Sequence, residues 1–204
     1  YKSDLKAIGG KQIGRYLIKE NVKGFIAKNI VNDNKAVIKP NSILVQRIVA
    51  HVEKPREHIE IMASSSDIID CNESIVVDTI NQLTPRTKIN SLLFLAILNS
   101  KLMSWYAYRF IFGKAIRAMS FDNPVSANFP VPKNFDKKQE THITKLADQM
   151  LSLQKKLHET KSVGNEKEAL ERQITNIDHE IDQEVYKLYN ITEEEQKIIE
   201  ESLK

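Results

Sequence analysis

The sequence predicts an α+β fold, a mostly antiparallel sheet domain with a packed helix, followed by a long antiparallel α-helical hairpin. Short β-branched runs broken by turn residues occupy much of residues 12–83, whereas residues 137–189 repeat apolar side chains at helical spacing. A proline-punctuated step at residues 130–133 separates the two patterns. We therefore expect a first domain at 1–132 and a second at 133–204.

The strand candidates come first. Residues 42–52 form the clearest one, because they are rich in β-branched side chains and follow the turn Lys39-Pro40-Asn41. Two short strands are expected within 12–31, around Lys23-Gly24. The remaining candidates are 59–62, 67–69 and 74–83. Their short connections favour antiparallel pairing.

A helical period follows at residues 88–112, and its apolar side chains lie on nearly all sides. Such a helix packs against a sheet on one side and another element on the other. The buried-looking run ends in the polar step Asn99-Ser100-Lys101, and Gly113 is a plausible helix stop. We expect the aromatic residues of 105–112 to pack in the core rather than stack on bases.

Two a/d-type seams define the helical hairpin, one on each side of Gly164-Asn165. The seam residues are Ile143, Leu146, Met150, Leu153 and Leu157, then Leu170, Ile174, Ile177, Ile181, Val185 and Leu188. A short polar connection makes the two helices antiparallel neighbours, although the seam leaves open a homodimer through the helices. Thr192-Glu193-Glu194-Glu195 is a capping-box signature for a short last helix, and Asn190 can take the left-handed turn before it.

Charge divides the chain in the same way as the apolar pattern. Residues 1–132 contain 18 Lys+Arg and 11 Asp+Glu, whereas residues 133–204 contain 12 and 16. A basic globular part joined to a mildly acidic helical part suits a DNA-facing module on a structural support, although ordinary variation in charge explains it too. Cys71 is the only cysteine, which excludes an internal disulfide and favours a cytoplasmic location. No apolar run is long enough to span a bilayer.

Four stretches, in this order, resemble the TaqI-like C-terminal specificity domain, the target-recognition domain of restriction-modification enzymes. They are Gly10-Lys11-Gln12-Ile13-Gly14-Arg15-Tyr16; Lys39-Pro40 with residues 43–48; residues 92–102 with Asn128-Phe129-Pro130-Val131-Pro132; and residues 177–195, which include Val185-Tyr186-Lys187-Leu188-Tyr189. One departure is Asn190, where the family more often has glycine.

The resemblance implies a parent enzyme that methylates DNA with S-adenosylmethionine and, in members that also cut DNA, uses Mg²⁺. It places those cofactors, and the catalytic residues, upstream of this kind of domain, so we expect no cofactor and no catalysis in this chain. Consistent with this, the amino-methyltransferase motif Asn-Pro-Pro-Tyr is absent, because Asn123-Pro124 continues with Val125-Ser126. Since the chain begins at Tyr1 within patterned sequence, we interpret it as a fragment of a longer polypeptide.

Readout of duplex DNA needs cationic and amide side chains that reach base edges, together with phosphate contacts. The candidates are Lys11, Arg15, Gln46, Arg47, Arg86, Lys88, Lys114 and Arg117. Each of them also has a simpler interpretation as a solvated surface side chain, and Arg47 could instead pair with a carboxylate inside the domain. His51 and His58 lack further ligands at a suitable spacing, so we expect no metal site.

Two other functions fit the pattern. A type I-like specificity subunit also joins recognition domains to long helices, with catalysis in separate subunits. The tail at 177–195 favours an enzyme with the catalytic domain on the same chain over a separate specificity subunit. A helical-hairpin interaction module without DNA binding would instead form a dimer through residues 143–188.

Overall fold

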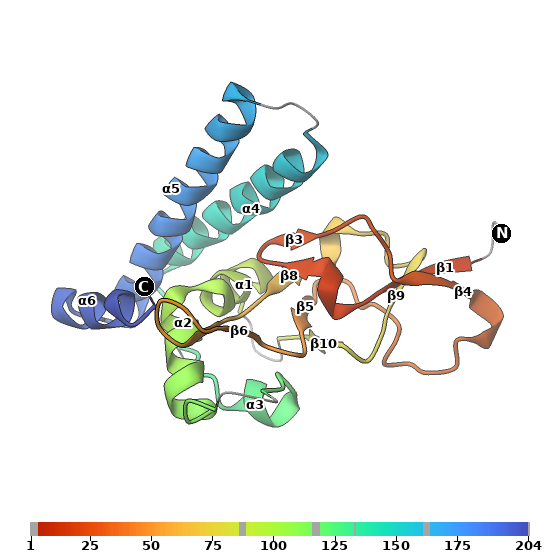
Figure 1. The fold of residues 1–204 in the computed structure, drawn as a ribbon, viewed down its shortest axis with the longest axis horizontal. Coiled ribbons are helices and arrows are strands. Elements are labelled where there is room, and N and C mark those ends of the chain that lie inside the picture. The colour runs from red at the N-terminus through yellow and green to blue at the C-terminus, as the bar shows by residue number, and fades with distance from the viewer. Residues whose placement is uncertain (1–3, 86–88, 116–118, 133, 161–163, 204) are drawn as a thin grey trace.

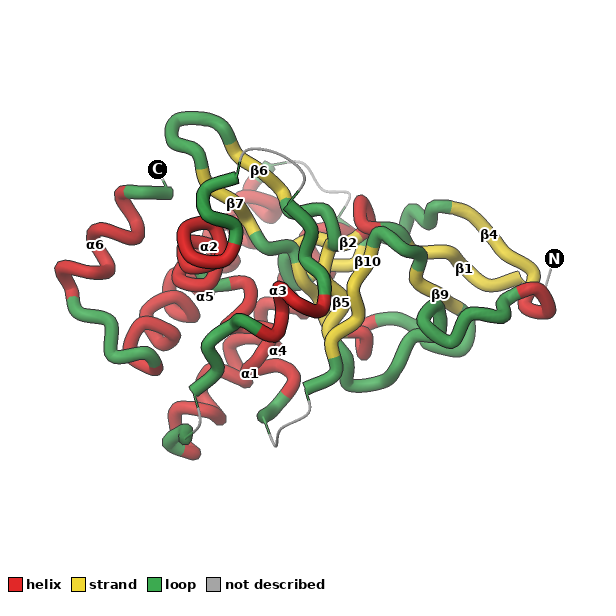
Figure 2. The backbone as a smooth tube through the Cα atoms, turned by 90° about the horizontal axis from the view of Figure 1, so that it is seen from below, coloured by secondary structure: helices red, strands yellow, loops and turns green. Residues whose placement is uncertain are grey.

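The chain has the α+β fold that the sequence predicts, with strands gathered at one end of the molecule and helices at the other (Figures 1 and 2). The structure, a computed structural model, describes residues 4–85, 89–115, 119–132, 134–160 and 164–203. The strands are β1 (Asp4–Ile8), β2 (Ile13–Gly14), β3 (Leu17–Ile18), β4 (Gly24–Ala27), β5 (Ile43–Gln46), β6 (Ala50–Val52), β7 (His58–Glu60), β8 (Ala63–Ser65), β9 (Ser74–Val76) and β10 (Ile80–Leu83).

The helices follow the strands along the chain, apart from three short 3₁₀ turns. These turns are η1 (Gly10–Gln12), η2 (Lys28–Ile30) and η3 (Ser66–Ile68). The longer elements are α1 (Ser91–Asn99), α2 (Lys101–Tyr106), the π-helix η4 (Ala107–Ile111), α3 (Asn123–Ala127), α4 (Lys137–Glu159), α5 (Asn165–Leu188) and α6 (Glu193–Glu201).

The strands form several small sheets rather than one large sheet. Two three-stranded sheets have the orders β4-β1-β9 and β10-β5-β8, and β2-β3 and β6-β7 are two-stranded. The pairing is antiparallel as predicted, except that β1 and β9 run parallel. Strand β1 was not predicted, and neither was β8, whose residues 63–65 are buried beside α1.

The prediction of one strand over residues 42–52 is wrong, because β5 and β6 belong to different sheets. The chain leaves β5 at Arg47, whose carbonyl accepts a hydrogen bond from the Phe121 amide at 2.7 Å. Two residues later, the Val49 amide donates to the Met119 carbonyl at 3.2 Å. Between β5 and β6, the backbone therefore pairs with the distant segment around Ser120 instead of continuing in the sheet of β5.

Two further strand predictions need correction. Residues 67–69 were expected to be a strand, but Asp67 and Ile68 lie in η3, where the Ser65 hydroxyl accepts a hydrogen bond from the Asp67 amide. Residues 74–83 form two strands, β9 and β10, in two different sheets. A bond from the Ile80 amide to the Val77 carbonyl closes the turn between them.

The predicted helix over 88–112 is interrupted at Ser100, whose ψ of 154° is extended. Ser100 ends α1 and begins α2 at once, because its hydroxyl donates to the Ile97 carbonyl and accepts from the Met103 amide. The polar step at residues 99–101 therefore ends the buried helix as expected, but a second helix continues in a new direction. Gly113 has the left-handed φ of 56° that ends η4.

The predicted helical hairpin is confirmed as α4 and α5, and the last helix α6 begins with the predicted capping box at Thr192. Asn190 has the expected left-handed φ of 53°. Several seam residues, including Ile143, Met150, Ile181 and Val185, are buried in the same core as α1, β5 and β8. One hydrophobic core therefore extends across the predicted boundary at 132/133.

Candidate nucleic-acid interface

A tight contact between η1 and Thr79, the residue before β10, builds a corner of the molecule that carries several cationic side chains. The Gly10 amide donates to the Thr79 hydroxyl at 2.9 Å. A Cβ atom at Gly10 would lie 2.8 Å from the Thr79 carbonyl oxygen, which is closer than real Cβ contacts allow. The sequence Gly9-Gly10 therefore lets two backbone segments approach where a side chain would separate them.

Within η1, neighbouring side chains have opposite environments. The Gln12 side chain is buried, and its Oε1 accepts a hydrogen bond from the Gly9 amide at 3.0 Å. Lys11 is exposed and makes no ion pair with any carboxylate among the described residues. The hydrogen-bonded turn thus fixes the backbone of Lys11, and the Lys11 side chain extends into solvent.

Gln46 and Arg47 lie at the end of β5, beside the same turn. The Arg47 amide donates to the Thr79 carbonyl at 2.9 Å, and the Gln46 side chain packs 3.4 Å from the Cβ position of Gly10. The Arg47 guanidinium donates to the Ser120 hydroxyl and to the Asp78 carbonyl, both at 3.2 Å. Both acceptors are neutral oxygens, so they orient the guanidinium without forming an ion pair with it.

Lys23 joins this group, although the sequence analysis did not select it. Its Cδ lies 3.2 Å from the Cβ position of Gly9, and its amide donates to the Ala7 carbonyl at 2.8 Å. The backbone bond that places Lys23 joins it to Ala7, 16 residues earlier. The sequence around Lys23 therefore contains no pattern that would predict its place in this group. We refer to Lys11, Lys23, Gln46 and Arg47 as the η1 corner.

The stretch of sequence that supplies the η1 corner is strongly unbalanced in charge. Residues 11–47 contain eight Lys+Arg and two Asp+Glu. Seven of these cations are exposed and form no ion pair within the described part of the chain: Lys11, Lys19, Lys23, Lys28, Lys35, Lys39 and Arg47. Such an excess of unpaired cations favours a polyanion as partner, and the exposed Asp78 beside Arg47 is the acidic residue nearest to it in the corner.

Arg15 does not belong to this surface. Its guanidinium makes two hydrogen bonds to the Asp178 carboxylate on α5, at 2.6 and 3.0 Å, and a third to the Asn99 carbonyl at 2.8 Å. These three bonds direct the guanidinium toward α1 and α5, away from the exposed lysine of η1, so Arg15 is no longer a candidate for base contact. Its role is to join the β2-β3 turn to α1 and α5.

The other candidates are less closely defined. Lys114 is exposed after Gly113, with a left-handed φ of 60°, and its amide donates to the Tyr108 carbonyl at 2.8 Å. No described contact brings Lys114 to the η1 corner. Arg86, Lys88 and Arg117 lie outside the described residues.

The polar step at residues 99–101 connects the sheets to the helical hairpin. The Asn99 side chain accepts from the Ala63 amide at 3.1 Å and donates to the Ala63 carbonyl at 3.0 Å, as a neighbouring strand would. The Lys101 amide donates to Asp182 at 2.9 Å, and its ammonium pairs with the same carboxylate at 3.0 Å. Together with Arg15, these contacts fix the direction of α5 relative to the η1 corner.

Glycine substitutions test the close approach in the η1 corner. Gly10→Ala should lower the free energy of unfolding by about 1–3 kcal/mol, because the new methyl group must displace the Thr79 backbone. Gly24→Ala is the matched control, since nothing lies within 4 Å of its Cβ position. Urea unfolding measures both variants, and equal stabilities would contradict the close contact.

Asp182 gives the junction a dependence on pH. Burial raises the pKa of its carboxyl group, and the neighbouring Lys101 ammonium opposes this effect. A raised folded-state pKa means that this group's contribution to stability is complete below the ordinary value of 3.8 and is lost as pH rises through the folded-state value. The stability of the wild type relative to Asp182→Asn should therefore fall as pH rises through this window.

Urea unfolding between pH 3.5 and pH 7 measures this difference. Asp148→Asn, at an exposed position on α4, is the matched control. If the wild type instead became more stable relative to Asp182→Asn as the pH rises, the raised pKa of Asp182 would be contradicted.

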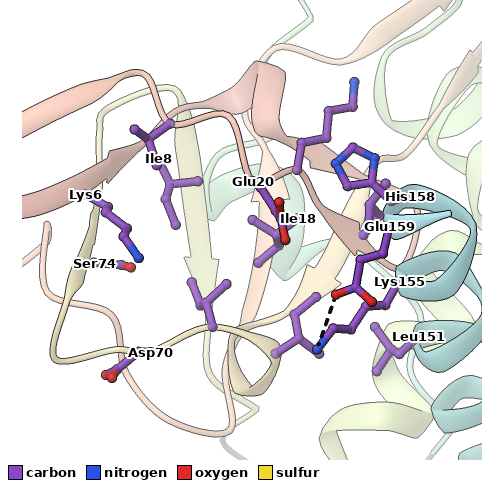
Figure 3. A pocket seen from close by; sticks show the side chains of 15 residues that line it. Lys6, Ile8, Ile18, Glu20, Asp70, Ser74, Leu151, Lys155, His158 and Glu159 are labelled. Atoms are coloured by element: carbon purple, nitrogen blue, oxygen red, sulfur yellow. Dashed lines mark ion pairs between the residues drawn. The ribbon is translucent and has the colours of Figure 1, made fainter. Parts of the chain in front are cut away.

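A separate cleft of about 460 Å³ lies between the sheet β4-β1-β9 and the end of α4 (Figure 3). Its rim mixes charges, including Lys6, Glu20, Asp70 and His158. Lys155 and Glu159 pair with each other across one side at 3.7 Å, and Lys6 pairs with Glu73 at the same distance. The cleft is therefore nearly balanced in charge and differs from the η1 corner.

The described residues contain no group of three or more side chains arranged to hold a metal ion. Among the same residues, no helix combines the length and apolar character needed to cross a bilayer. No protein-family model matches the chain, and a search of curated proteins finds no significantly similar sequence.

Proposed function

We propose that this chain recognises a specific sequence of double-stranded DNA for a restriction-modification enzyme and positions an attached S-adenosylmethionine-dependent methyltransferase. The η1 corner is the observation that carries the proposal. It combines an arginine, a glutamine and two lysines on a rigid backbone, within a segment of strong positive charge. The resemblance to TaqI-like specificity domains supplies the biological setting.

The chemistry of these side chains divides the work of recognition. The planar guanidinium of Arg47 and the amide of Gln46 are suited to guanine and adenine edges in the major groove. Lys11 and Lys23 are point charges suited to phosphate oxygens, which position the protein without reading sequence. Because Arg47 is already oriented by Ser120 and Asp78, little further ordering is needed on binding.

The helical hairpin serves as a rigid support in this proposal. Arg15, Asn99 and Lys101 link the sheets to α5, so the hairpin cannot swing freely about the η1 corner. A fixed direction would set the distance between the recognised base pairs and an attached catalytic domain. S-adenosylmethionine, and Mg²⁺ where DNA is also cut, belong to that domain, and no residue of this chain is assigned to them.

Paired substitutions in the η1 corner test the proposal, after a preferred duplex has been selected from random sequences. Lys11→Ala should weaken all duplexes alike and reduce the salt dependence by about one unit of slope. Arg47→Ala should cost the preferred duplex about 1–3 kcal/mol and relax specificity. Fluorescence anisotropy at several salt concentrations measures both effects.

Matched variants separate charge from geometry. Arg47→Lys keeps the charge but not the planar fork, so it should lose specificity while keeping the salt dependence. Lys145→Ala removes an exposed lysine from α4 and should change neither. If the 204-residue chain does not bind duplex DNA even at low salt, the proposal fails. Salt-insensitive self-association in its place would favour a helical-hairpin interaction module.

A type I-like specificity subunit would use the η1 corner in the same way. The two versions differ only in whether the methyltransferase is fused or separate, and the sequence of the parent polypeptide decides between them.

A further inference from the structure

A group of aromatic side chains reaches the surface where α2 continues into η4. The Phe110 ring lies 5.6 Å from the Trp105 ring and 5.3 Å from the Tyr106 ring, measured between centroids. Phe110 is 64% exposed, so it departs from the core packing expected for the aromatic residues of 105–112. The Arg109 guanidinium lies over the Trp105 ring, 5.4 Å from its centroid. These four residues, which we call the η4 patch, form one contiguous aromatic and cationic group.

The π-helical geometry of η4 builds this group. The Phe112 amide donates to the Ala107 carbonyl, five residues back, at 2.8 Å. The wider turn brings Trp105 and Phe110, also five residues apart, into contact. Tyr108 faces the interior, where it is 6% exposed and lies beside His51 of β6. The η4 patch is therefore held from beneath, and π-turns of this kind occur frequently at functional sites.

Helix α6 carries a second exposed apolar side chain in the helical half of the molecule. Ile198 is 58% exposed, whereas its neighbour Ile199 is 2% exposed and anchors the helix in the main core. The nine residues of α6 include five glutamates and a single cation, Lys197. Glu194 is exposed and precedes Ile198 by four residues, which places both on one side of the helix. We call these two residues the α6 face.

The loop between β6 and β7 brings α6 and η4 to the same part of the surface. The Arg56 guanidinium donates to the Glu201 carbonyl at the end of α6, at 2.7 Å. The next residue, Glu57, accepts a hydrogen bond from the Tyr108 hydroxyl of η4 at 3.5 Å. Helix α6 also packs against α2, which continues directly into η4 (Figure 1). One surface region therefore contains both the η4 patch and the α6 face.

Charge indicates what kind of surface would cover the η4 patch. Residues 79–121, which include α2 and η4, contain six Lys+Arg and no Asp+Glu. Glu57 reaches η4, but its carboxylate already binds the Tyr108 hydroxyl. Arg109 and Glu194 form no ion pair within the described part of the chain. The patch thus complements an acidic surface with an exposed apolar side chain, whereas the nearby glutamates of α6 would repel a nucleic acid.

We propose that two copies of this chain form a two-fold symmetric dimer, in which the η4 patch of each copy binds the α6 face of the other. Phe110 packs against Ile198 of the second copy, and Arg109 pairs with Glu194 of the second copy. Two-fold symmetry makes each contact occur twice. Aromatic residues and arginine are also enriched among the residues that dominate binding energy.

This inference goes beyond the proposed function and does not depend on it. The dimer forms through the helical half of each copy, without DNA. Under the proposed function, it would carry two η1 corners related by the two-fold axis, which suits an inverted repeat in the recognised sequence.

Sedimentation equilibrium of the 204-residue chain, over a range of concentrations and without DNA, tests the dimer. The wild type should approach twice the mass of one chain as its concentration rises. Phe110→Ala should weaken the dimer by at least about 30-fold, the loss expected for one dominant aromatic contact. Phe25→Ala is the matched control, because this ring is 66% exposed on β4 and should leave the dimer unchanged. Circular dichroism checks that both variants are folded.

A charge exchange tests the pairing of the two surfaces. Arg109→Glu should dissociate the dimer, because it places a carboxylate opposite Glu194 of the second copy. Adding Glu194→Arg should restore the dimer, a result that misfolding cannot produce.

Two results would overturn the dimer. One is a wild type that stays monomeric at the highest concentration at which it is soluble. The other is a dimer that persists in both Phe110→Ala and Arg109→Glu, since another surface, such as residues 143–188, would then hold it together. Neither result bears on the proposed function, because the salt dependence of duplex binding by the wild type is measured separately.

Discussion

Replacing Asn99 with leucine should strongly destabilise the protein although the two side chains are similar in size. Asn99 is 2% exposed, and its amide bonds both the amide and the carbonyl of Ala63. Leucine would leave the Ala63 amide without a partner, at a cost of about 1–3 kcal/mol, whereas the Ala63 carbonyl would keep its bond from the Tyr16 amide and lose only the second one, worth about 0.5–1.5 kcal/mol. We therefore expect the free energy of unfolding to fall by roughly 1.5–4.5 kcal/mol, a large part of the usual total of about 5–15 kcal/mol.

Urea unfolding followed by circular dichroism measures this loss, with Asn176→Leu as the matched control. Asn176 is exposed on α5, so its replacement should change stability by no more than about 0.5 kcal/mol. A fall of less than about 1 kcal/mol in Asn99→Leu would mean that water replaces the lost hydrogen bonds. The bonds between Asn99 and Ala63 would then not be what stabilises the junction.

Asn99 also illustrates what the sequence can and cannot predict about the helices. The apolar run before it and the polar step after it predict a buried helix that ends there, and α1 ends at that residue. The immediate restart at Ser100 combines a local cap, in which the Ser100 hydroxyl accepts from the Met103 amide, with a bond from the Lys101 amide to Asp182, which lies 81 residues away. The hairpin of α4 and α5 was predictable because its seam is a local pattern that repeats many times.

The strands were harder to predict for a related reason. The β-branched richness of residues 42–52 is the same for one strand as for two strands in different sheets. The choice depends on the segment around Ser120, which bonds the backbone at Arg47 and Val49. Short strands such as β2 and β3, with two residues each, leave almost no pattern to detect.

The candidate interface shows the same limit for single charges. Lys11 and Arg15 look equivalent in the sequence, four residues apart in one basic segment. The fold separates them, because η1 turns Lys11 to solvent while the β2-β3 turn directs Arg15 toward Asp178, 163 residues away. Composition could predict a basic surface, but the assignment of each cation required the tertiary partners.

Arg15→Met should destabilise the protein by about 2–3 kcal/mol, because it leaves the Asp178 carboxylate partly buried without its partner. The two side chains are 28% and 23% exposed, so we expect a smaller cost than for a fully buried pair, where losing one partner costs about 3–5 kcal/mol. The lost bond to the Asn99 carbonyl adds to the effect.

A double-mutant cycle with Asp178→Asn isolates the coupling between the two side chains, which we expect to be about 1–3 kcal/mol. The exposed pair Lys167–Glu171 on α5 is the matched control, with a coupling of at most about 0.5 kcal/mol. DNA specificity provides the decisive second measurement, because three donors of the Arg15 guanidinium already bind Asp178 and Asn99 inside the protein. If Arg15→Met relaxed specificity as much as Arg47→Ala under conditions where both variants are folded, Arg15 would return to the interface and the junction would lose its main support.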